Sequence, residues 1–223
     1  MHVLLVHGMG RTPLSFLRLA RALRRAGHST EMVGYVAAVE RFAGIRRRVR
    51  NRLEAAARRG EPYAAIGHSL GGVLLRAALA GWPRSLPPPA ELILLGTPHS
   101  AARLARMATR FRPVGLLFGQ SGQLLARESF FRALPPCDVP CLVIAGTRGW
   151  RTARAPFGGA PNDGIVAVEE VRPPGTAEFV EVPAGHTFMM RDRRVMTLVL
   201  AALSAAASRS APGDGPPAPG APG

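Results

Sequence analysis

Lysine is absent from this 223-residue sequence, so all 29 of its formally cationic Lys and Arg positions are arginine. Acidic residues are few, at 14, which leaves a formal net charge of +15. Such a charge suits nucleic acid, an anionic membrane surface or an acidic partner. The sequence has no zinc-finger spacing or RNA-recognition signature, however, and no specific nucleic-acid partner is expected. We interpret the charge as a compositional bias toward arginine and keep a functional basic patch as the alternative.

Cysteine is scarce, with Cys137 and Cys141 flanking the segment DVP. A strand is predicted to begin there, and residues four apart in an extended chain lie well beyond disulfide reach. We therefore expect two free thiols. A second set of ligands at zinc spacing is missing, so we expect no metal site, and nothing in this pattern calls for an oxidising compartment.

Long hydrophobic runs are missing as well. The N-terminal MHVLLVHG lacks a basic segment and a small-residue cleavage site, which favours a strand over a signal peptide. The run VMTLVLAALSAAA is too short to cross a bilayer. A soluble, cytoplasmic protein is therefore expected.

The sequence does contain a repeated pattern of short apolar segments, each followed by a turn and most by a helix-like segment. Its length and 47% hydrophobic content indicate one domain with a proper core. Strands that alternate with helices need crossover connections, which predicts an α/β fold with a mostly parallel sheet and helices on both faces. Six strands are predicted, at 2–6, 30–36, 63–67, 91–96, 139–146 and 177–183.

Helix signals lie between these strands. Thr12 is a candidate N-cap, with Pro13 at the first helical position. Helices are predicted at 12–27, 42–53, 70–81 and about 188–206.

The domain is predicted to span residues 1–207. Residues 208–223, rich in Pro, Gly and Ala, cannot bury apolar surface, so a disordered tail is expected there. Residues 147–162 are predicted to form an irregular loop.

The sequence GHSLG, residues 67–71, sets a serine between a buried strand and a helix. A sharp strained turn in that setting lifts a serine hydroxyl off the sheet, and side chains at Gly67 and Gly71 would collide with their neighbours. Ser69 is therefore a candidate nucleophile. Its hydroxyl needs a histidine as base, and that histidine needs an orienting carboxylate.

Six histidines could supply the base. His186 follows the last strand in AGHTF, where an imidazole can lie over the end of the sheet, so we favour it; a capping or buried structural role is the alternative. His99, in GTPHS, could line the site, and His7 is expected to act through its backbone. Structural roles are favoured for the remaining three, His2, His28 and His68.

The acid is predicted to be Asp163, in NDGIV, which follows the fifth strand and precedes His186. An ordinary turn residue is the alternative. Glu169 and Glu170 are further candidate acids. The other aspartates are poorly placed, before a strand, in the last helix and in the tail: Asp138, Asp192 and Asp214.

Attack on a carbonyl creates an oxyanion, which needs two preplaced N–H donors. Leu70 is predicted to supply one at a helix N-terminus, where the dipole has the helpful sign. Met9, in HGMG after the first strand, is predicted to supply the other, with Gly10 as the alternate. The substrate-binding residues are predicted to be His7, Gly8, Gly10, His68, His99, Leu117 and Phe118.

These motifs, LLVHGMG, IGHSLGG, LLGTPHS, NDGIV and AGHTF in this order, resemble bacterial lipases and esterases of the α/β-hydrolase superfamily. The resemblance is closest to small lipases with a reduced six-stranded sheet, and it covers most of residues 2–203. It implies that Ser69, Asp163 and His186 form a catalytic triad, with Met9 and Leu70 as the oxyanion hole.

Residues 99–135 are longer than a bare connection needs. Within them, Leu104, Met107 and Phe111 share one helical face while three arginines share another. The segment is similar in position to the lid or cap of larger lipases, but its apolar residues could equally be core: Leu116, Leu117, Phe118, Leu124, Leu125, Phe130 and Phe131.

The sequence therefore predicts a monomeric serine hydrolase that cleaves carboxylic esters of small molecules or lipids without a cofactor. Thioester or amide hydrolysis would use the same residues. The rival hypothesis is a non-catalytic basic protein that binds anionic membrane or nucleic acid, and weak attraction to an anionic membrane is compatible with either. The arginine face at 103, 106 and 110 is the best support for the rival.

Overall fold

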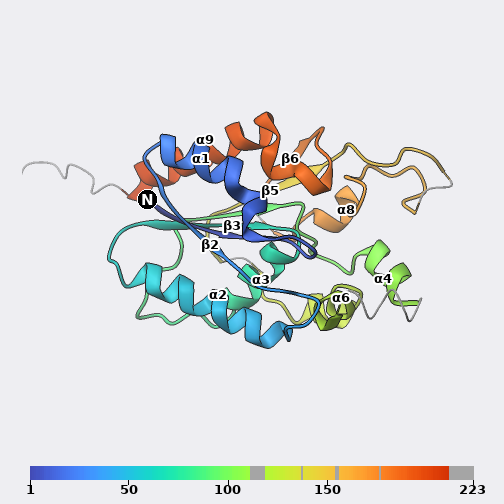
Figure 1. The fold of residues 1–223 in the computed structure, drawn as a ribbon, viewed down its shortest axis with the longest axis horizontal. Coiled ribbons are helices and arrows are strands. Elements are labelled where there is room, and N and C mark those ends of the chain that lie inside the picture. Colours follow the sequence, from blue (N-terminus) through green and yellow to red (C-terminus); the bar gives the residue numbers. More distant parts are fainter. Residues whose placement is uncertain (111–118, 137, 154–155, 176, 211–223) are drawn as a thin grey trace, which may run out of the picture.

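The computed structural model describes residues 1–110, 119–136, 138–153, 156–175 and 177–210. Within this part of the chain, one six-stranded sheet has the order β2-β1-β3-β4-β5-β6, and every neighbouring pair is parallel (Figure 1). The predicted α/β class and the six predicted strands are confirmed. The strands are β1 (His2–Val6), β2 (Ser29–Val33), β3 (Tyr63–His68), β4 (Glu91–Leu95), β5 (Cys141–Gly146) and β6 (Glu178–Val182).

Helices cover both faces of the sheet (Figure 1). On β1, Leu4 and Val6 pack into the core on one face, whereas Val3 and Leu5 pack into the core on the other. Strands buried on both faces read as continuous apolar runs, which is why the sequence pattern located them. The first core contains α2 (Phe42–Ala57) and α3 (Leu70–Leu79), and the second contains α1 (Leu17–Arg25) and α9 (Arg193–Ser210).

The strand order reverses beside β1, because β2 lies on one side of β1 and all later strands lie on the other. In open α/β sheets, such a reversal opens a crevice at the carboxyl ends of the strands, where ligands bind. Because all six strands are parallel, the loops that follow them meet at one edge, which we call the carboxyl edge.

Two local predictions near the N-terminus differ from the structure. β2 ends at Val33 rather than at residue 36, because Tyr35 leaves the sheet to stack on His7, with ring centroids 4.1 Å apart, and to donate its hydroxyl to the His7 carbonyl. A 3-10 turn, Pro13–Phe16, precedes α1. Thr12 is the N-cap residue of this turn and Pro13 lies at its start, as predicted, although the side chain of Thr12 makes no capping hydrogen bond.

The helix predicted at 188–206 is two elements. A 3-10 segment, His186–Arg191, ends at the extended residue Asp192, and α9 then runs to Ser210. The Asp192 carboxylate accepts the Arg194 N–H (2.8 Å), which helps start the second helix. The helix therefore continues past residue 208, where the tail was predicted to begin, and residues 211–223 lie outside the described residues.

The insertion at 99–135 contains α4 (Arg103–Arg110), α6 (Gly119–Leu125) and α7 (Glu128–Arg132). Its second half packs against the core, because Leu125 and Phe131 are buried and Phe130 packs edge-to-face on Phe42 at 5.3 Å. α4 lies at the carboxyl edge (Figure 1), with Met107 42% exposed. Three of the predicted apolar residues, together with Phe111, lie outside the described residues: Leu116, Leu117 and Phe118.

Cys141 is buried in β5, and Cys137 lies outside the described residues. No helix in the described part of the chain is both long and apolar enough to cross a membrane.

Candidate active site

Ser69 occupies the tight turn between β3 and α3. Its φ of 53° and ψ of −122° make it the one non-glycine residue with positive φ in the described ranges. Such a conformation costs of order 1–3 kcal/mol and persists only where the surrounding structure holds it. Here the Ser69 N–H donates to the Leu95 carbonyl of β4 (2.9 Å), and the Ser69 carbonyl accepts from Gly72 (3.0 Å).

The glycines around Ser69 allow this turn to pack closely. A Cβ on Gly67 would lie 2.5 Å from the Cα of Gly72, and one on Gly71 would lie 2.0 Å from the carbonyl oxygen of Val6. The predicted collisions with the helix and the neighbouring strand are therefore confirmed. Gly72 faces the same limit, because its Cβ would lie 2.0 Å from Oγ1 of Thr97.

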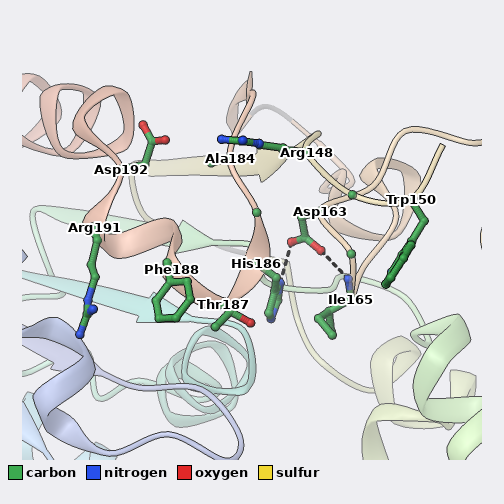
Figure 2. A pocket seen from close by; sticks show the side chains of 13 residues that line it. Arg148, Trp150, Asp163, Ile165, Ala184, His186, Thr187, Phe188, Arg191 and Asp192 are labelled. Carbon is green, nitrogen blue, oxygen red and sulfur yellow. Dashed lines mark hydrogen bonds and ion pairs between the residues drawn. The ribbon is translucent and has the colours of Figure 1, made fainter.

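Asp163 and His186 form a buried pair at the carboxyl edge, from the loops after β5 and β6. Oδ2 of Asp163 lies 2.6 Å from Nδ1 of His186, and the Asp163 side chain is fully buried. Its other oxygen, Oδ1, accepts the N–H groups of Ile165 (2.9 Å) and Val166 (2.8 Å), and Figure 2 shows the carboxylate between Ile165 and the imidazole. The backbone N–H of His186 also donates to the backbone carbonyl of Asp163 (2.9 Å), so two hydrogen bonds join the two loops.

This geometry sets the protonation of the imidazole. An ionised carboxylate only accepts hydrogen bonds, so Nδ1 of a neutral His186 donates to Asp163. The proton is then absent from Nε2, which can accept a proton from another group. The buried carboxylate thus holds the imidazole of His186 in one tautomer.

Ser69 and His186 line one cavity of about 570 Å³ at the carboxyl edge. Part of its wall comes from α4, through Leu104, Ala105 and Ala108, and part from Leu125 of α6 and Val166. These side chains are apolar, so the cavity suits an apolar ligand group next to the serine.

The fold matches solved structures over most of both chains. Lipase BlEst2 of Bacillus licheniformis, in its mature form, aligns with a TM-score of 0.71 and 17% identity, covering 89% of this chain and 91% of that one. The thioesterase RedJ of Streptomyces coelicolor has a TM-score of 0.58 and 19% identity over 92% and 90%. An extracellular α/β-hydrolase of a Paenibacillus species has a TM-score of 0.58 and 13% identity over 90% and 97%.

The chain has the α/β-hydrolase fold. Comparisons with protein-family models and with curated protein sequences give no match.

Within this α/β-hydrolase fold, the residues predicted as oxyanion donors come from the loop after β1 and from the start of α3. Leu70 is the first residue of α3, and an N–H in the first turn of a helix has no intrahelical acceptor. Met9 and Gly10 line the cavity, in a turn closed by a hydrogen bond from Arg11 N–H to the Gly8 carbonyl (3.3 Å). The loop after β1 thus lines the same cavity as Ser69, which Leu70 directly follows in the chain.

His68 and Gly8 pack behind the serine. Nε2 of His68 donates to the backbone carbonyl of His186 (2.9 Å), and the centroids of the two imidazole rings lie 4.7 Å apart. Burial, followed by the proximity of His186, lowers the pKa of His68 well below 6.5, so this ring stays neutral beside the imidazole of His186. A Cβ on Gly8 would lie 2.8 Å from Nδ1 of His68 and 3.1 Å from Cβ of Ser69. His68 also lines the cavity, whereas the ring of His7 stacks on Tyr35 and does not.

His99 and the two alternative acids lie away from this site. The His99 N–H donates to the Glu170 carbonyl (2.7 Å), and burial, then the charge of Arg76, lowers the pKa of His99 to about 4. The Glu170 carboxylate accepts the N–H groups of Ala167 (2.9 Å) and Arg103 (2.6 Å), and Glu169 pairs with Arg103. Neither glutamate contacts His186 through an ion pair or hydrogen bond in the described structure.

The residues that line the cavity and that sequence reasoning missed include Arg11, Val166 and Thr187. Each of them lies within or directly after a motif that had been recognised, in HGMG, NDGIV and AGHTF. The neighbours of a motif in the same loop were therefore a usable signal. Leu104 was recognised as apolar, but the cavity-facing side of α4 carries Ala105 and Ala108 rather than Met107.

Proposed function

We propose that this protein is a serine hydrolase that cleaves carboxylic esters through an acyl-enzyme. The observation that carries the proposal is the buried Asp163–His186 pair, whose His186 lines the same cavity as the strained Ser69. Solved structures with this fold include a lipase and a thioesterase, which supports hydrolysis in general.

In the proposed reaction, Nε2 of His186 takes the proton of Ser69 while Oγ bonds to the acyl carbon. The carbonyl oxygen becomes an oxyanion, stabilised by the N–H groups of Leu70 and Met9, with Gly10 as the alternate donor. Asp163 stabilises the imidazolium. The bond to the leaving alcohol then breaks, and the alcohol leaves with the proton from His186.

Water completes the cycle. Its proton passes to His186 as its oxygen attacks the acyl carbon, and Ser69 recovers that proton when the acid product leaves. The apolar wall from α4 and α6 favours an apolar acyl group. Thioesters and amides would use the same steps, and their rates relative to oxygen esters decide among them.

The experiment that tests this proposal is turnover of 4-nitrophenyl esters with acyl chains from acetyl to dodecanoyl. Wild type is expected to hydrolyse them with kcat/KM rising with chain length, and Ser69→Ala is expected to lose at least about 10³-fold in kcat. Ser204→Ala, at an exposed serine of α9, is the matched control and should retain full activity. Equal activity in wild type and Ser69→Ala would contradict the proposal.

The rival hypothesis of a basic binding protein gains little from α4, because Arg103 is paired with Glu169 at 2.9 Å. It predicts no Ser69-dependent turnover, together with binding to anionic vesicles or DNA that disappears as salt rises. Turnover that depends on Ser69 would exclude it as the main function.

A further inference from the structure

A second cavity, of about 670 Å³, lies next to His186 (Figure 2). It shares Ile165, His186 and Thr187 with the cavity that contains Ser69. The two cavities therefore meet at the imidazole, and we call the second one the outer groove. It contains neither Ser69 nor the apolar residues of α4.

Two exposed aromatic side chains line the outer groove. Trp150 is 60% exposed and Phe188 is 59% exposed, and Figure 2 shows them on opposite sides of His186. The backbone of Trp150 is fixed by the buried Asn162, whose Oδ1 accepts the Trp150 N–H (2.9 Å) and whose Nδ2 donates to the Trp150 carbonyl (2.7 Å). This wall is thus held by the residue next to Asp163.

Two arginines are part of the groove. Arg148 and Arg191 line it, and the guanidinium carbon of Arg191 lies 5.3 Å from the centroid of the Phe188 ring. Arg11, which lines the Ser69 cavity, approaches the same ring to 5.6 Å. Cations over an aromatic face are attracted by its quadrupole, so two positive charges lie at the Phe188 ring.

Among the described residues, Arg11, Arg148 and Arg191 form no ion pair, in contrast to arginines such as Arg48, Arg103 and Arg172. Two carboxylates do line the groove. Asp163 is bound to His186, and Asp192 accepts the Arg194 N–H (2.8 Å).

The proposed function indicates which part of the substrate the outer groove would bind. His186 must protonate the leaving alcohol or thiol, so the leaving group lies within hydrogen-bond reach of the imidazole, while the acyl chain lies along α4. We propose that the outer groove binds the leaving group of the substrate and selects an alcohol or thiol that carries a phosphate-type anion. The inference rests on the proposed serine hydrolase function.

Arginine suits this role because its planar guanidinium recognises phosphate and also stacks on aromatic rings. In the acyl-transfer step the bond from the acyl carbon to the leaving oxygen or sulfur breaks, and the leaving atom takes the proton of His186. The phosphate itself does not react.

A pair of soluble esters tests the proposal: hexanoates of a phenol that carries either a para-phosphate or a para-methoxy group. The measured quantity is the ratio of kcat/KM for the anionic ester to that for the neutral one. The variant Arg148→Gln/Arg191→Gln should lower this ratio about tenfold, because each exposed charge pair is worth up to about a fivefold factor. A ratio within twofold of wild type would overturn the proposal.

The matched control is Arg21→Gln/Arg25→Gln, which removes the same charge from exposed positions on α1. It should leave both activities and the ratio unchanged. An equal fall of the ratio in the control would mean that overall charge, not the groove, attracts the anionic ester, and would overturn the proposal.

A second measurement uses wild type alone, so it does not depend on the folding of the variant. Phenyl phosphate should inhibit hydrolysis of the neutral ester competitively, and phenol at the same concentration should inhibit at least about fivefold less. Equal inhibition by both would contradict the groove. If wild type hydrolyses neither ester in a Ser69-dependent manner, the hydrolase function and this inference are overturned together.

Discussion

Replacing Asp163 by Asn gives the sharpest test of how His186 is held. Oδ1 of Asp163 accepts two backbone N–H groups, from Ile165 and Val166, at 2.9 and 2.8 Å. In the variant, these two donors keep the amide oxygen on their side and turn the NH₂ toward His186. The amide then donates to Nδ1, so the imidazole proton moves to Nε2 and the base faces Ser69 in the wrong tautomer.

The size of the effect follows from that inversion. A base that carries its proton on Nε2 cannot accept the proton of Ser69, and the same change in serine proteases costs about 10⁴ in kcat. We expect a loss of about 10³–10⁴, which corresponds to about 4–5.5 kcal/mol of transition-state stabilisation. The fold should persist, because the two backbone hydrogen bonds to Oδ1 are kept.

Two assays check this prediction. Hydrolysis of 4-nitrophenyl hexanoate gives kcat, and ¹⁵N-detected NMR of the imidazoles reports which nitrogen of His186 carries the proton. The proton should lie on Nδ1 in wild type and on Nε2 in Asp163→Asn. A variant that keeps more than a tenth of wild-type kcat, or that keeps the proton on Nδ1, would refute this reasoning.

Three further predictions follow from single contacts. Gly71→Ala should lower the unfolding free energy by about 3 kcal/mol or more in urea melts, because its Cβ would lie 2.0 Å from the Val6 carbonyl oxygen. Gly44→Ala, where a Cβ meets nothing within 4 Å, should instead stabilise α2 by about 0.5–1 kcal/mol; equal effects would contradict the steric argument. The pKa of His99, about 4 when folded against 6.5 unfolded, means that the unfolded chain binds more protons below pH 6.5. As the pH falls from about 6 to 4, His99 should therefore lower the free energy of unfolding by about 1.4 kcal/mol per pH unit. This contribution to the pH dependence should disappear in His99→Gln. Leu104→Trp should fill the cavity and lower kcat/KM for decanoate at least about tenfold more than for acetate, and a uniform loss would place the acyl chain elsewhere.

The α/β class could be predicted from the sequence because buried parallel strands leave continuous apolar runs, and β1, β3, β4 and β5 are buried throughout. The sequence also predicted that the candidate residues lie close together, because parallel strands end at one edge of the sheet and motifs after different strands converge there. Neither argument needed a contact between side chains.

Contacts between distant segments were the part that the sequence could not supply. His68 was interpreted as structural, yet its ring lies against His186, which is 118 residues away in the chain. Tyr35 ended β2 early because of its stacking on His7, which local propensity does not encode. The orientation of α4, with Ala108 toward the cavity and Met107 exposed, depends on how that helix packs.

The central claim is that Ser69 is the nucleophile of a covalent reaction, and intact-mass spectrometry after treatment with a fluorophosphonate tests it most directly. One adduct per chain is expected, mapped by peptide sequencing to Ser69 and absent in Ser69→Ala. Labelling should be at least about 10²-fold slower in Asp163→Asn. A folded wild-type protein that gains no adduct, or gains it at another residue, would contradict the account.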